Sequence, residues 1–512
     1  MLDTIKMRKF YTTLLITSLI IGCSQDDINN EALEGEVEVE VEAQEEIINQ
    51  PPDNFEVDIR DILHDGATIN WSEALDPEND SVTYSVYLNQ ILVVENITDL
   101  TYHLNQLEEL STYSGKIIAK DTYNNLTEVN FSFQTEKYFL KYLKKYDYGE
   151  YSYGPNGYAY GSSNTLIKSN DQNYLISGTS VFPDGNGHRL SITKTDYEGN
   201  ILWRKYYDYR LTDGWRPTII NSPTGIILAS HHHVLSLDNE GNTIWYKKID
   251  SYDISDGSAD IRSVAQDSEG NIYIVGGRGS ENPDIKQQAV LTKLNSSGEI
   301  QWEKIFESSR RNFFDDIVIS NTNNLIILGS TETNGASSTH EEQIDFWVLK
   351  LTGEGEVIWE NTFGDIRYDF TRKIIVKSNG NYVFAGHSWG AYDISEGRIF
   401  EINSEGTEIW NVSTELSSTF SIAETIDGGF ITTGHVDFGD YGALGIYKFS
   451  SSGAEEWNKK YQESFTYLYG RSVLPEEDGG YRIIGSLGKN YYYNDDKPEL
   501  LIYKTDPEGK YE

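Results

Sequence analysis

Short apolar runs recur in one fixed order along most of the chain. In residues 315–363 the apolar run 317–319 is followed by an Asn-rich turn and the run 325–328. A long polar loop then leads to the run 346–351, a Gly turn and a fourth run. Runs of this length, separated by turn residues, predict β-strands. Four in succession predict one antiparallel four-stranded sheet.

Each of these four-stranded units ends in the pattern Gly-x-x-x-Trp. The six tryptophans of the pattern are Trp203, Trp245, Trp302, Trp359, Trp410 and Trp457. The chain stops just beyond Gly509, and "YLKKYDYG" from Tyr142 matches "WNKKYQES" from Trp457. Seven units of this length predict the blades of a β-propeller. We expect the split seventh unit to close the ring by pairing the two chain ends.

The repeated glycine and tryptophan have structural interpretations. The glycine suits a positive φ in the hairpin between the third and fourth strands. The tryptophan suits the wedge between adjacent blades, which a large flat side chain fills. A sheet of this kind has both faces to bury, so radial stacking is required. We therefore expect residues 137–512 to form a seven-bladed propeller of four-stranded antiparallel blades.

This pattern resembles the repeat of quinoprotein-type propellers and of outer-membrane assembly lipoproteins with that shape. The resemblance implies an architecture. The dehydrogenases of that group use a vicinal cysteine pair and a bound quinone, whereas no cysteine follows Cys23 here. The resemblance therefore does not carry redox chemistry or a quinone cofactor over to this chain.

Residues 51–136 have the alternating pattern of a separate β-sandwich. Ile69 and Trp71 fall on one side of one expected strand, and Tyr84 and Val86 on one side of the next. With Trp71 as a core tryptophan and a Leu107…Tyr113 corner, the segment resembles a fibronectin type III module. The resemblance implies a spacer. The whole fold is thus expected to be all-β, a sandwich followed by a propeller.

Two clusters are candidate metal ligands. Asp76, Glu78 and Asp80 crowd one turn and could attract calcium, although we interpret them as a solvated turn rich in Asp, Asn and Pro. Residues 231–233 are three consecutive histidines, but zinc needs three or four ligands and no companion motif is visible, so we interpret them as part of a tight hairpin. We expect no cofactor, with calcium as the open possibility.

The N-terminal residues have the order of a bacterial secretion signal. Basic residues precede an apolar run that is short for a membrane span, and the run ends in Ile-Gly-Cys at Cys23. This ending resembles a lipobox, which implies cleavage after residues 1–22 and lipidation of Cys23. The acidic "SQDD" segment resembles an export signal of surface lipoproteins. We expect an outer-membrane anchor facing the cell exterior, with the periplasmic face as the alternative.

Charge limits the partners of the chain. Within residues 23–50, glutamate occupies every other position from 34 to 42, so like charges repel and an extended tether is expected. The formal net charge of the whole chain is −40. That excess argues against nucleic-acid binding, which needs clustered Lys and Arg. The single cysteine excludes an intramolecular disulfide.

An arginine set marks the candidate ligand site. We align the units on the glycine of the turn after their first strand. The position eight residues before that glycine is then equivalent in all units. Four units have an arginine there: Arg216, Arg262, Arg372 and Arg471. The other three have Asn164, Asp315 and Phe420. The first strand is innermost in a propeller, so these side chains are expected around the channel mouth.

These guanidinium groups have two interpretations. They could bind a carboxylate, a sulfate or a sugar acid. Alternatively, each could tie its blade to an acidic side chain of a neighbouring loop. The loops on the same face carry Trp215, Tyr368 and Tyr469 among many tyrosines, which suits either a glycan or peptide site or simple capping of the blades.

Three functions remain open at this level. The first is a non-enzymatic surface lipoprotein that binds a glycan or protein through its loop-rich face. The second is a periplasmic scaffold in envelope assembly. The third is a polysaccharide-degrading enzyme on a propeller, although no nucleophile elbow, phosphate loop or zinc motif is visible.

Overall fold

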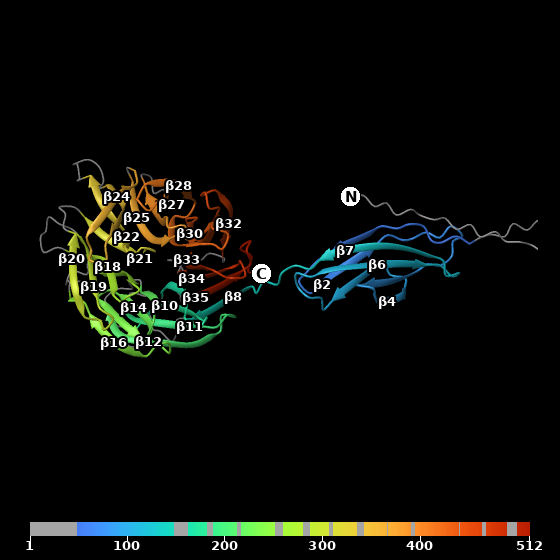
Figure 1. The fold of residues 1–512 in the computed structure, drawn as a ribbon, viewed down its shortest axis with the longest axis horizontal. Helices are drawn as coiled ribbons and strands as arrows, with labels where there is room; N and C mark the ends of the chain where they lie inside the picture. The colour runs from blue at the N-terminus through green and yellow to red at the C-terminus, as the bar shows by residue number, and fades with distance from the viewer. Residues whose placement is uncertain are drawn as a thin grey trace, which may run out of the picture. The chain divides into compact units, whose positions relative to one another are not determined.

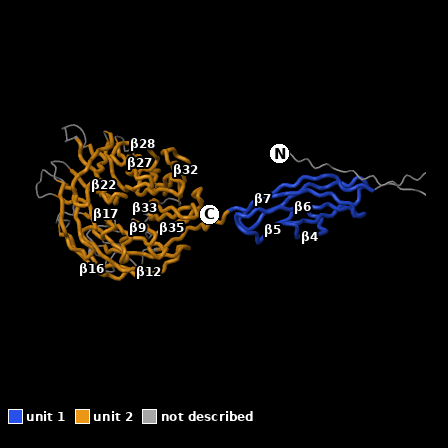
Figure 2. Tube along the Cα trace, viewed as in Figure 1, with its two compact units in different colours: residues 1–136 blue, residues 137–512 orange. Residues whose placement is uncertain are grey.

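The computed structural model describes residues 49–147, 162–181, 188–211, 217–250, 260–279, 287–306, 311–334, 343–365, 367–390, 395–439, 441–462, 467–488 and 499–512. Within these ranges the regular elements are β-strands, which confirms the all-β fold class. The chain divides into two compact units, Met1–Glu136 and Lys137–Glu512 (Figure 2). Among the residues that the structure describes, no helix is long and apolar enough to cross a membrane.

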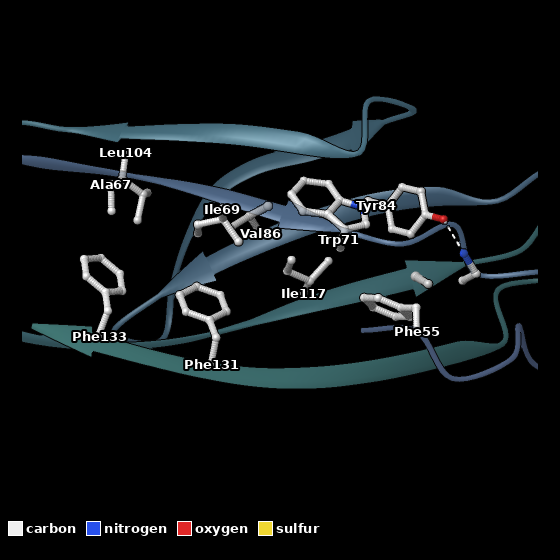
Figure 3. Close-up of a cluster of buried hydrophobic side chains, with 12 residues drawn as sticks. Phe55, Ala67, Ile69, Trp71, Tyr84, Val86, Leu104, Ile117, Phe131 and Phe133 are labelled. Carbon is white, nitrogen blue, oxygen red and sulfur yellow. Dashed lines mark hydrogen bonds between the residues drawn. The ribbon is translucent and has the colours of Figure 1, made fainter. Parts of the chain in front are cut away.

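The first unit is a sandwich of two antiparallel sheets. One sheet has the order β1 (Val57–Arg60), β2 (Gly66–Trp71), β5 (Thr101–Asn105). The other has the order β4 (Ile91–Ile97), β3 (Thr83–Leu88), β6 (Thr112–Lys120), β7 (Leu126–Gln134). Ile69, Trp71, Val86 and Ile117 pack between the sheets (Figure 3). The alternating pattern of these strands is what places one face of each sheet in this core.

Two tyrosines complete this core with hydrogen bonds. The Ala74 backbone N–H donates to the Tyr84 hydroxyl over 2.8 Å, which satisfies the polar end of a buried ring (Figure 3). The Glu108 backbone N–H donates to the Tyr113 hydroxyl over 2.8 Å at the start of β6. Leu107 packs against the same core. The Leu107…Tyr113 spacing therefore fixes one corner of the sandwich.

The acidic turn between β2 and β3 is organised by one carboxylate. Asp76 Oδ1 accepts hydrogen bonds from the backbone N–H groups of Glu78, at 3.0 Å, and of Asp80, at 2.9 Å. This is the local bonding that makes Asp favourable in turns. In the described ranges no group of three or more His, Cys, Asp or Glu side chains is arranged to hold a metal ion.

The second unit consists of seven four-stranded antiparallel blades, named blades 1 to 7 in chain order. Blade 1 consists of β9 (Ser162–Lys168), β10 (Tyr174–Val181), β11 (His188–Thr195) and β12 (Ile201–Leu211). Blade 2 consists of β13 (Thr218–Ser222), β14 (Gly225–Ser230), β15 (His233–Leu237) and β16 (Thr243–Lys248). Blade 3 consists of β17 (Asp260–Gln266), β18 (Ile272–Arg278), β19 (Gln288–Leu294) and β20 (Ile300–Phe306). Blade 4 consists of β21 (Asn312–Ile319), β22 (Leu325–Asn334), β23 (Gln343–Leu351) and β24 (Val357–Phe363). Blade 5 consists of β25 (Tyr368–Val376), β26 (Tyr382–Trp389), β27 (Ser395–Ile402) and β28 (Glu408–Thr414). Blade 6 consists of β29 (Ser418–Glu424), β30 (Phe430–Asp437), β31 (Gly442–Phe449) and β32 (Glu455–Tyr461).

The seventh blade joins both parts of the chain. Its first three strands are β33 (Tyr467–Pro475), β34 (Tyr481–Gly488) and β35 (Glu499–Thr505). Its outer strand is β8 (Tyr142–Asp147), which pairs antiparallel with β35 and lies beside it in Figure 1. The first strands of successive blades contact one another in a closed cycle from β9 through β33 and back to β9. The expected closure by pairing of the chain ends is confirmed.

The repeated tryptophans bind each blade to the next. A Cβ added at the turn glycine Gly298 would lie 2.8 Å from the ring of Trp245, so no other side chain fits between them. The turn glycines that follow the third strands all have φ between 75° and 83°. Trp203, Trp302, Trp359, Trp410 and Trp457 pack in the same way against the turn glycine of the following blade. Tyr142 takes this place at the closing seam, against Gly199.

A buried ion pair lies at the seam between blades 7 and 1. Arg482 is fully buried, and its Nε donates to Glu476 Oε1 over 2.7 Å. The Tyr174 hydroxyl of blade 1 donates to the other oxygen of Glu476 over 2.7 Å. The guanidinium lies 3.7 Å from the Tyr174 ring centroid and donates to the Tyr197 carbonyl over 2.9 Å. Arg482 therefore links the two blades on which ring closure depends.

We predict that Arg482→Met lowers the free energy of unfolding by about 3–5 kcal/mol, because it leaves the Glu476 carboxylate buried without its counter-charge. Urea unfolding followed by tryptophan fluorescence measures the change. The double variant Arg482→Met/Glu476→Gln removes both charges and is expected to be clearly more stable than the single variant. Equal losses in the two variants would show that the charge pairing is not what matters.

Candidate functional site

The inner strands of blades 3 to 7 each contain a β-bulge at the same position. In blade 3, Ile261 pairs with Gly276 and Ser263 pairs with Val275, so the residue between them has no partner on β18. A bulge of this kind re-aims one side chain relative to the regular alternation of a strand. The five extra residues are Arg262, Asp315, Arg372, Phe420 and Arg471. They occupy the position that the sequence alignment made equivalent.

A glycine on the second strand faces each bulge. A Cβ at Gly276 would lie 1.8 Å from the Asp260 carbonyl oxygen, and one at Gly434 would lie 2.0 Å from the Ser418 carbonyl oxygen. The inner strand can approach this closely only where the partner has no side chain. The glycine is therefore the sequence signal of the bulge.

Burial shows where the extra residues point. Thr419 and Ser421 are 0% and 6% exposed, whereas Phe420 between them is partly exposed. Arg262, Asp315 and Arg471 are likewise partly exposed between two buried neighbours. In these four blades the residues on either side of the bulge are buried and the bulge residue is partly exposed; the residue after the bulge also belongs to the cavity lining.

The residue after each bulge bonds to the adjacent blade. Asp316, the residue after the bulge in blade 4, accepts a hydrogen bond at Oδ2 from the Ile374 backbone N–H over 2.9 Å. Ser421, the residue after the bulge in blade 6, accepts one at Oγ from the Val473 backbone N–H over 3.4 Å. The Leu166 backbone N–H donates to Ser472 Oγ over 3.3 Å across the closing seam. These bonds join neighbouring inner strands. They hold the bulge residues at fixed positions around the channel.

All five bulge residues line one central cavity of about 400 Å³. The other charged lining side chains are Asp260, Arg311, Asp316 and Lys373, and the lining includes the rings of Phe313 and Phe370. Among the described lining residues, five side chains are cationic and three are carboxylates. A local excess of cations in a chain of net charge −40 favours an anionic or strongly polar occupant.

On one side of the cavity Arg262 is paired with a carboxylate. Its Nη1 lies 2.7 Å from Asp315 Oδ1 in blade 4, and its Nε lies 3.7 Å from Asp260 Oδ2. Burial alone would lower the pKa of Arg262, but the charges of Asp315 and Asp260 outweigh it and raise that pKa. The Asp315 carboxylate also accepts a hydrogen bond from the Thr371 hydroxyl of blade 5. Arg262 thus ties blades together, as the structural interpretation of the arginines expected.

On the opposite side two arginines share one aromatic ring. The guanidinium carbons of Arg372 and Arg471 lie 5.6 Å and 4.7 Å from the centroid of Phe420, which belongs to the blade between them. Arg471 Nε donates to Ser486 Oγ over 3.1 Å, and Arg372 Nη1 donates to the Thr371 carbonyl over 3.0 Å. These contacts fix the orientation of both side chains.

The other expected site residues lie behind this cavity or outside the described ranges. Tyr469 stacks on the His435 ring at 4.4 Å and contacts Arg471 at 4.7 Å, but it is not a lining residue. Tyr368 begins β25 and stacks on Phe370 at 6.4 Å; Phe370, not Tyr368, lines the cavity. Trp215, Arg216 and Cys23 fall outside the described residues.

Two phenylalanine rings that the sequence analysis did not identify, those of Phe313 and Phe370, line the cavity, whereas Phe420 was expected at the channel mouth. Phe313 and Phe370 each stand two positions before a bulge, and Phe420 is itself a bulge residue. The repeat alignment that identified the arginines contains these two rings as well, since Phe313 and Phe370 lie two residues upstream of the aligned position.

A second depression, of about 650 Å³, lies outside the channel between blades 3 and 4. Its lining includes Trp347, whose Nε1 donates to Glu360 over 3.1 Å, and Glu332. Among its described lining residues there is no Lys or Arg. The central cavity is therefore the stronger candidate for ligand binding, because it brings rings and cations together.

Asp369 of blade 5 and Asp345 of blade 4 form a pair of buried carboxyl groups near the start of β25. Asp369, which precedes Phe370, is 1% exposed, and burial raises its pKa to about 7, although the Ser388 hydroxyl donates to it. Burial also raises the pKa of Asp345. Both carboxyl groups lie against Gly364, where a Cβ would be 2.1 Å and 2.8 Å from their oxygens. The start of β25 therefore carries a carboxyl group that titrates near neutral pH.

Neither a protein-family model nor a curated protein matches the sequence. Among solved structures, the chain is similar to the WD40 domain of Neurospora crassa Pan2, at 12% identity over 72% of this chain and 96% of that chain, with a TM-score of 0.45. It is also similar to the exotype rhamnogalacturonan lyase YesX (11% identity, 89% and 91% covered, TM-score 0.39) and to the Hadza microbial sialidase Hz136 (8%, 89% and 95%, 0.38). At these identities and TM-scores, none of them bears on what this chain binds.

We predict that Asp369→Asn stabilises the protein more at pH 8 than at pH 5. The folded protein holds the Asp369 proton more tightly than the unfolded chain does, so wild-type stability is lost as pH rises from about 4 to about 7. The variant avoids this loss, which is up to about 4 kcal/mol at pH 8. Urea unfolding at the two pH values measures the difference.

The matched control is Asp427→Asn. Burial would raise the pKa of Asp427, but hydrogen bonds from Lys448 and Thr425 outweigh it and hold that pKa at about 2. Its contribution is lost only below about pH 4, so the effect of this substitution is expected to be the same at pH 5 and pH 8. A similar pH dependence in both variants would contradict the assignment of the titration to Asp369.

Proposed function

We propose that this protein is a non-enzymatic binding module anchored at the cell surface, and that its propeller holds a ligand in the central cavity. The observation that carries the proposal is the set of five bulges, which bring Arg262, Asp315, Arg372, Phe420 and Arg471 to one space. Convergent polar groups beside aromatic rings are what ligand pockets use for orientation and contact. A volume of about 400 Å³ suits a small molecule or one end of a chain.

The bonding of two lining carboxylates favours binding over catalysis. Asp315 is held by Arg262 and by the Thr371 hydroxyl. Asp316 accepts from Ser263 Oγ over 2.6 Å and from the Ile374 backbone N–H, and Lys373 lies 3.1 Å away. Carboxylates fixed in this way are poorly placed to move protons to and from a substrate. A polysaccharide-degrading activity would instead appear as turnover in the same ligand screen.

The anchoring part of the proposal comes from the N-terminal residues. Lipidation of Cys23, a tether over residues 23–50 and a fibronectin type III-like spacer over residues 51–136 would hold the propeller away from an outer membrane. The spacer is supported by the two-sheet core around Trp71 and by the Glu108–Tyr113 hydrogen bond at the corner. An exposed position would give the cavity access to extracellular glycans or proteins.

A periplasmic scaffold is the second candidate, and the outer strands favour it. The residue before the tryptophan in four blades is an aliphatic side chain about half exposed: Leu202, Ile244, Ile358 and Ile409. These residues lie on edge strands, whose free backbone groups can pair with a strand of another protein. In this scaffold the contacts with partners would involve the blade rims and not the cavity.

We predict that a ligand from a panel of neutral and acidic glycans and peptides raises the melting temperature of the full chain carrying Cys23→Ser. Thr218→Trp, which fills the cavity from β13, is expected to abolish the shift. Thr243→Trp is the matched control, since Thr243 lies exposed on the outer strand β16. Equal shifts in both variants would move the binding site away from the cavity and favour the scaffold.

We predict that protease added to intact cells cleaves the wild-type protein, and that Cys23→Ser releases it from the membrane fraction. Immunoblotting of cells and fractions measures both effects, with a known periplasmic protein as the control for cell integrity. Protection of the wild type on intact cells would favour the periplasmic scaffold. Retention of the Cys23→Ser variant in the membrane would contradict lipid anchoring.

A further inference from the structure

A lysine of the third strand joins several blades to their neighbours. The residue that pairs with the repeated tryptophan, or with Tyr142 in blade 7, is a lysine in these blades: Lys194, Lys293, Lys350, Lys448 and Lys504. In blades 1, 3 and 4 its ammonium group donates to a turn carbonyl of the next blade, over 3.3 Å (Asn239), 3.2 Å (Gly353) and 3.1 Å (Ser404). These three carbonyls are equivalent, because each stands two residues before the turn glycine.

Two more interfaces use another donor for the equivalent carbonyl. Between blades 2 and 3, Trp245 Nε1 donates to the Ser296 carbonyl over 3.1 Å. Between blades 7 and 1, Arg482 Nη2 donates to the Tyr197 carbonyl over 2.9 Å. Between blades 5 and 6, where the third strand has no lysine at this position, no described residue donates to the Ser451 carbonyl. This turn carbonyl is therefore a regular acceptor for a nitrogen donor of the preceding blade.

Lys448 of blade 6 does not make this contact. Its ammonium group donates to Asp427 Oδ2 over 2.8 Å, to Glu456 Oε2 over 2.9 Å and to the Phe449 carbonyl over 3.2 Å. All three acceptors belong to blade 6, and they use the three N–H groups of the ammonium. Pro507 holds the equivalent position in blade 7, and no described residue donates to its carbonyl.

A cavity of about 270 Å³ lies between blades 6 and 7 at this point. The rings of Trp457 and Tyr481 line it, with their centroids 5.8 Å apart, and so does Pro507. It shares no described lining residue with the central cavity. Its volume is slightly below that of most pockets for drug-sized ligands, so it suits a small molecule.

The lining of this cavity carries an excess of negative charge. Its charged side chains are Asp427, Lys448, Glu456 and Glu476. The Glu476 carboxylate is paired with Arg482, and Lys448 balances only one of the other two carboxylates. Burial raises the pKa of Tyr481, and the charges of Asp427 and Glu456 raise it further, so the hydroxyl lies near both carboxylates. A cation is therefore the complementary occupant.

We propose that the cavity between blades 6 and 7 binds the primary ammonium group of a small amine. The ligand would take the place that a lysine ammonium group has between other blades, and would donate to the Pro507 carbonyl and the Glu456 carboxylate. Such charge-assisted hydrogen bonds are stronger than neutral ones. The rings of Trp457 and Tyr481 would contact the carbon skeleton and attract the cation. This site is separate from the central cavity and does not depend on the function proposed for it.

The test compares three compounds of similar shape, 2-phenylethylammonium, 2-phenylethanol and 3-phenylpropionate, by calorimetric titration of the full chain with Cys23→Ser. They share a phenyl ring on a short chain and differ in the charge of the end group. We expect the ammonium compound to bind at least about tenfold more tightly than the alcohol, because only its donor is charged. The carboxylate is expected to give no measurable binding, since the lining carboxylates repel it.

A matched pair of variants on the outer strand of blade 6 locates the site. Glu456→Gln removes a charged acceptor and is expected to weaken binding of the ammonium compound about tenfold. Glu455→Gln is the control, because Glu455 accepts from Asn458 Nδ2 over 2.7 Å and does not line the cavity. Its affinity is expected to equal that of the wild type.

Lys448→Met tests whether the ligand replaces a lysine ammonium group. The variant leaves Asp427 and Glu456 without their cation, and both carboxylates are about half exposed, so we expect it to fold. The ammonium compound is expected to bind it about tenfold more tightly than the wild type and to raise its melting temperature by more. The alcohol is expected to gain no affinity.

Three results would overturn the proposal. Equal affinity for the ammonium compound and the alcohol would show an apolar cavity without an ammonium site. Binding that persists in Glu456→Gln and is lost in Thr218→Trp would place the amine in the central cavity. Weaker or unchanged binding in Lys448→Met would show that the ligand does not take the place of a lysine. None of these results bears on whether the glycan and peptide panel binds in the central cavity.

Discussion

The burial of both faces of each blade is the constraint on which the propeller depends. A four-stranded sheet has two apolar faces and cannot cover either by itself, so each blade requires a neighbour on both sides. The tryptophan of one blade therefore packs against the turn glycine of the next. Blade 7 packs against blade 1, and the ring is complete because β8 supplies the outer strand of blade 7. The Arg482–Glu476 pair stabilises that one seam.

The same constraint determines what can face the channel. Inner strands approach their second strands so closely that a glycine is needed opposite the bulge, as at Gly276. The residues beside each bulge are used in contacts between blades, as Asp316 and Ser421 are. The bulge residue is the least buried of the three in blades 3, 4, 6 and 7, although Arg262 and Asp315 also pair across two blades. Variation at this position, from arginine to aspartate to phenylalanine, is therefore where the chemistry of the cavity can be set.

Much of the fold was predictable because its determinants are local and repeated. The Gly-x-x-x-Trp spacing identified six outer strands, and "YLKKYDYG" at Tyr142 identified the seventh. Alignment of the repeats also placed Arg262, Arg372 and Arg471 at one position, and all three line the cavity.

Other features depend on contacts between segments distant in sequence, and they were not predictable. The pairing of Arg262 with Asp315 joins two blades, and no local pattern distinguishes it from the contacts of Arg372. The raised pKa of Asp369 follows from burial against Gly364, which only the packed structure shows. Tyr469 was expected at the ligand surface, but its ring stacks behind Arg471 on His435.

The central claim is that the bulge exposes one side chain to the shared cavity, as it does Phe420, whereas the residues on either side of it are buried. Thiol accessibility tests it most directly, since Cys23 is the only cysteine and can be replaced by serine. Single variants Thr419→Cys, Phe420→Cys and Ser421→Cys are treated with iodoacetamide under native conditions. The account predicts fast modification at position 420 and strong protection at 419 and 421. Modification of either flanking position as fast as that of 420 would contradict it.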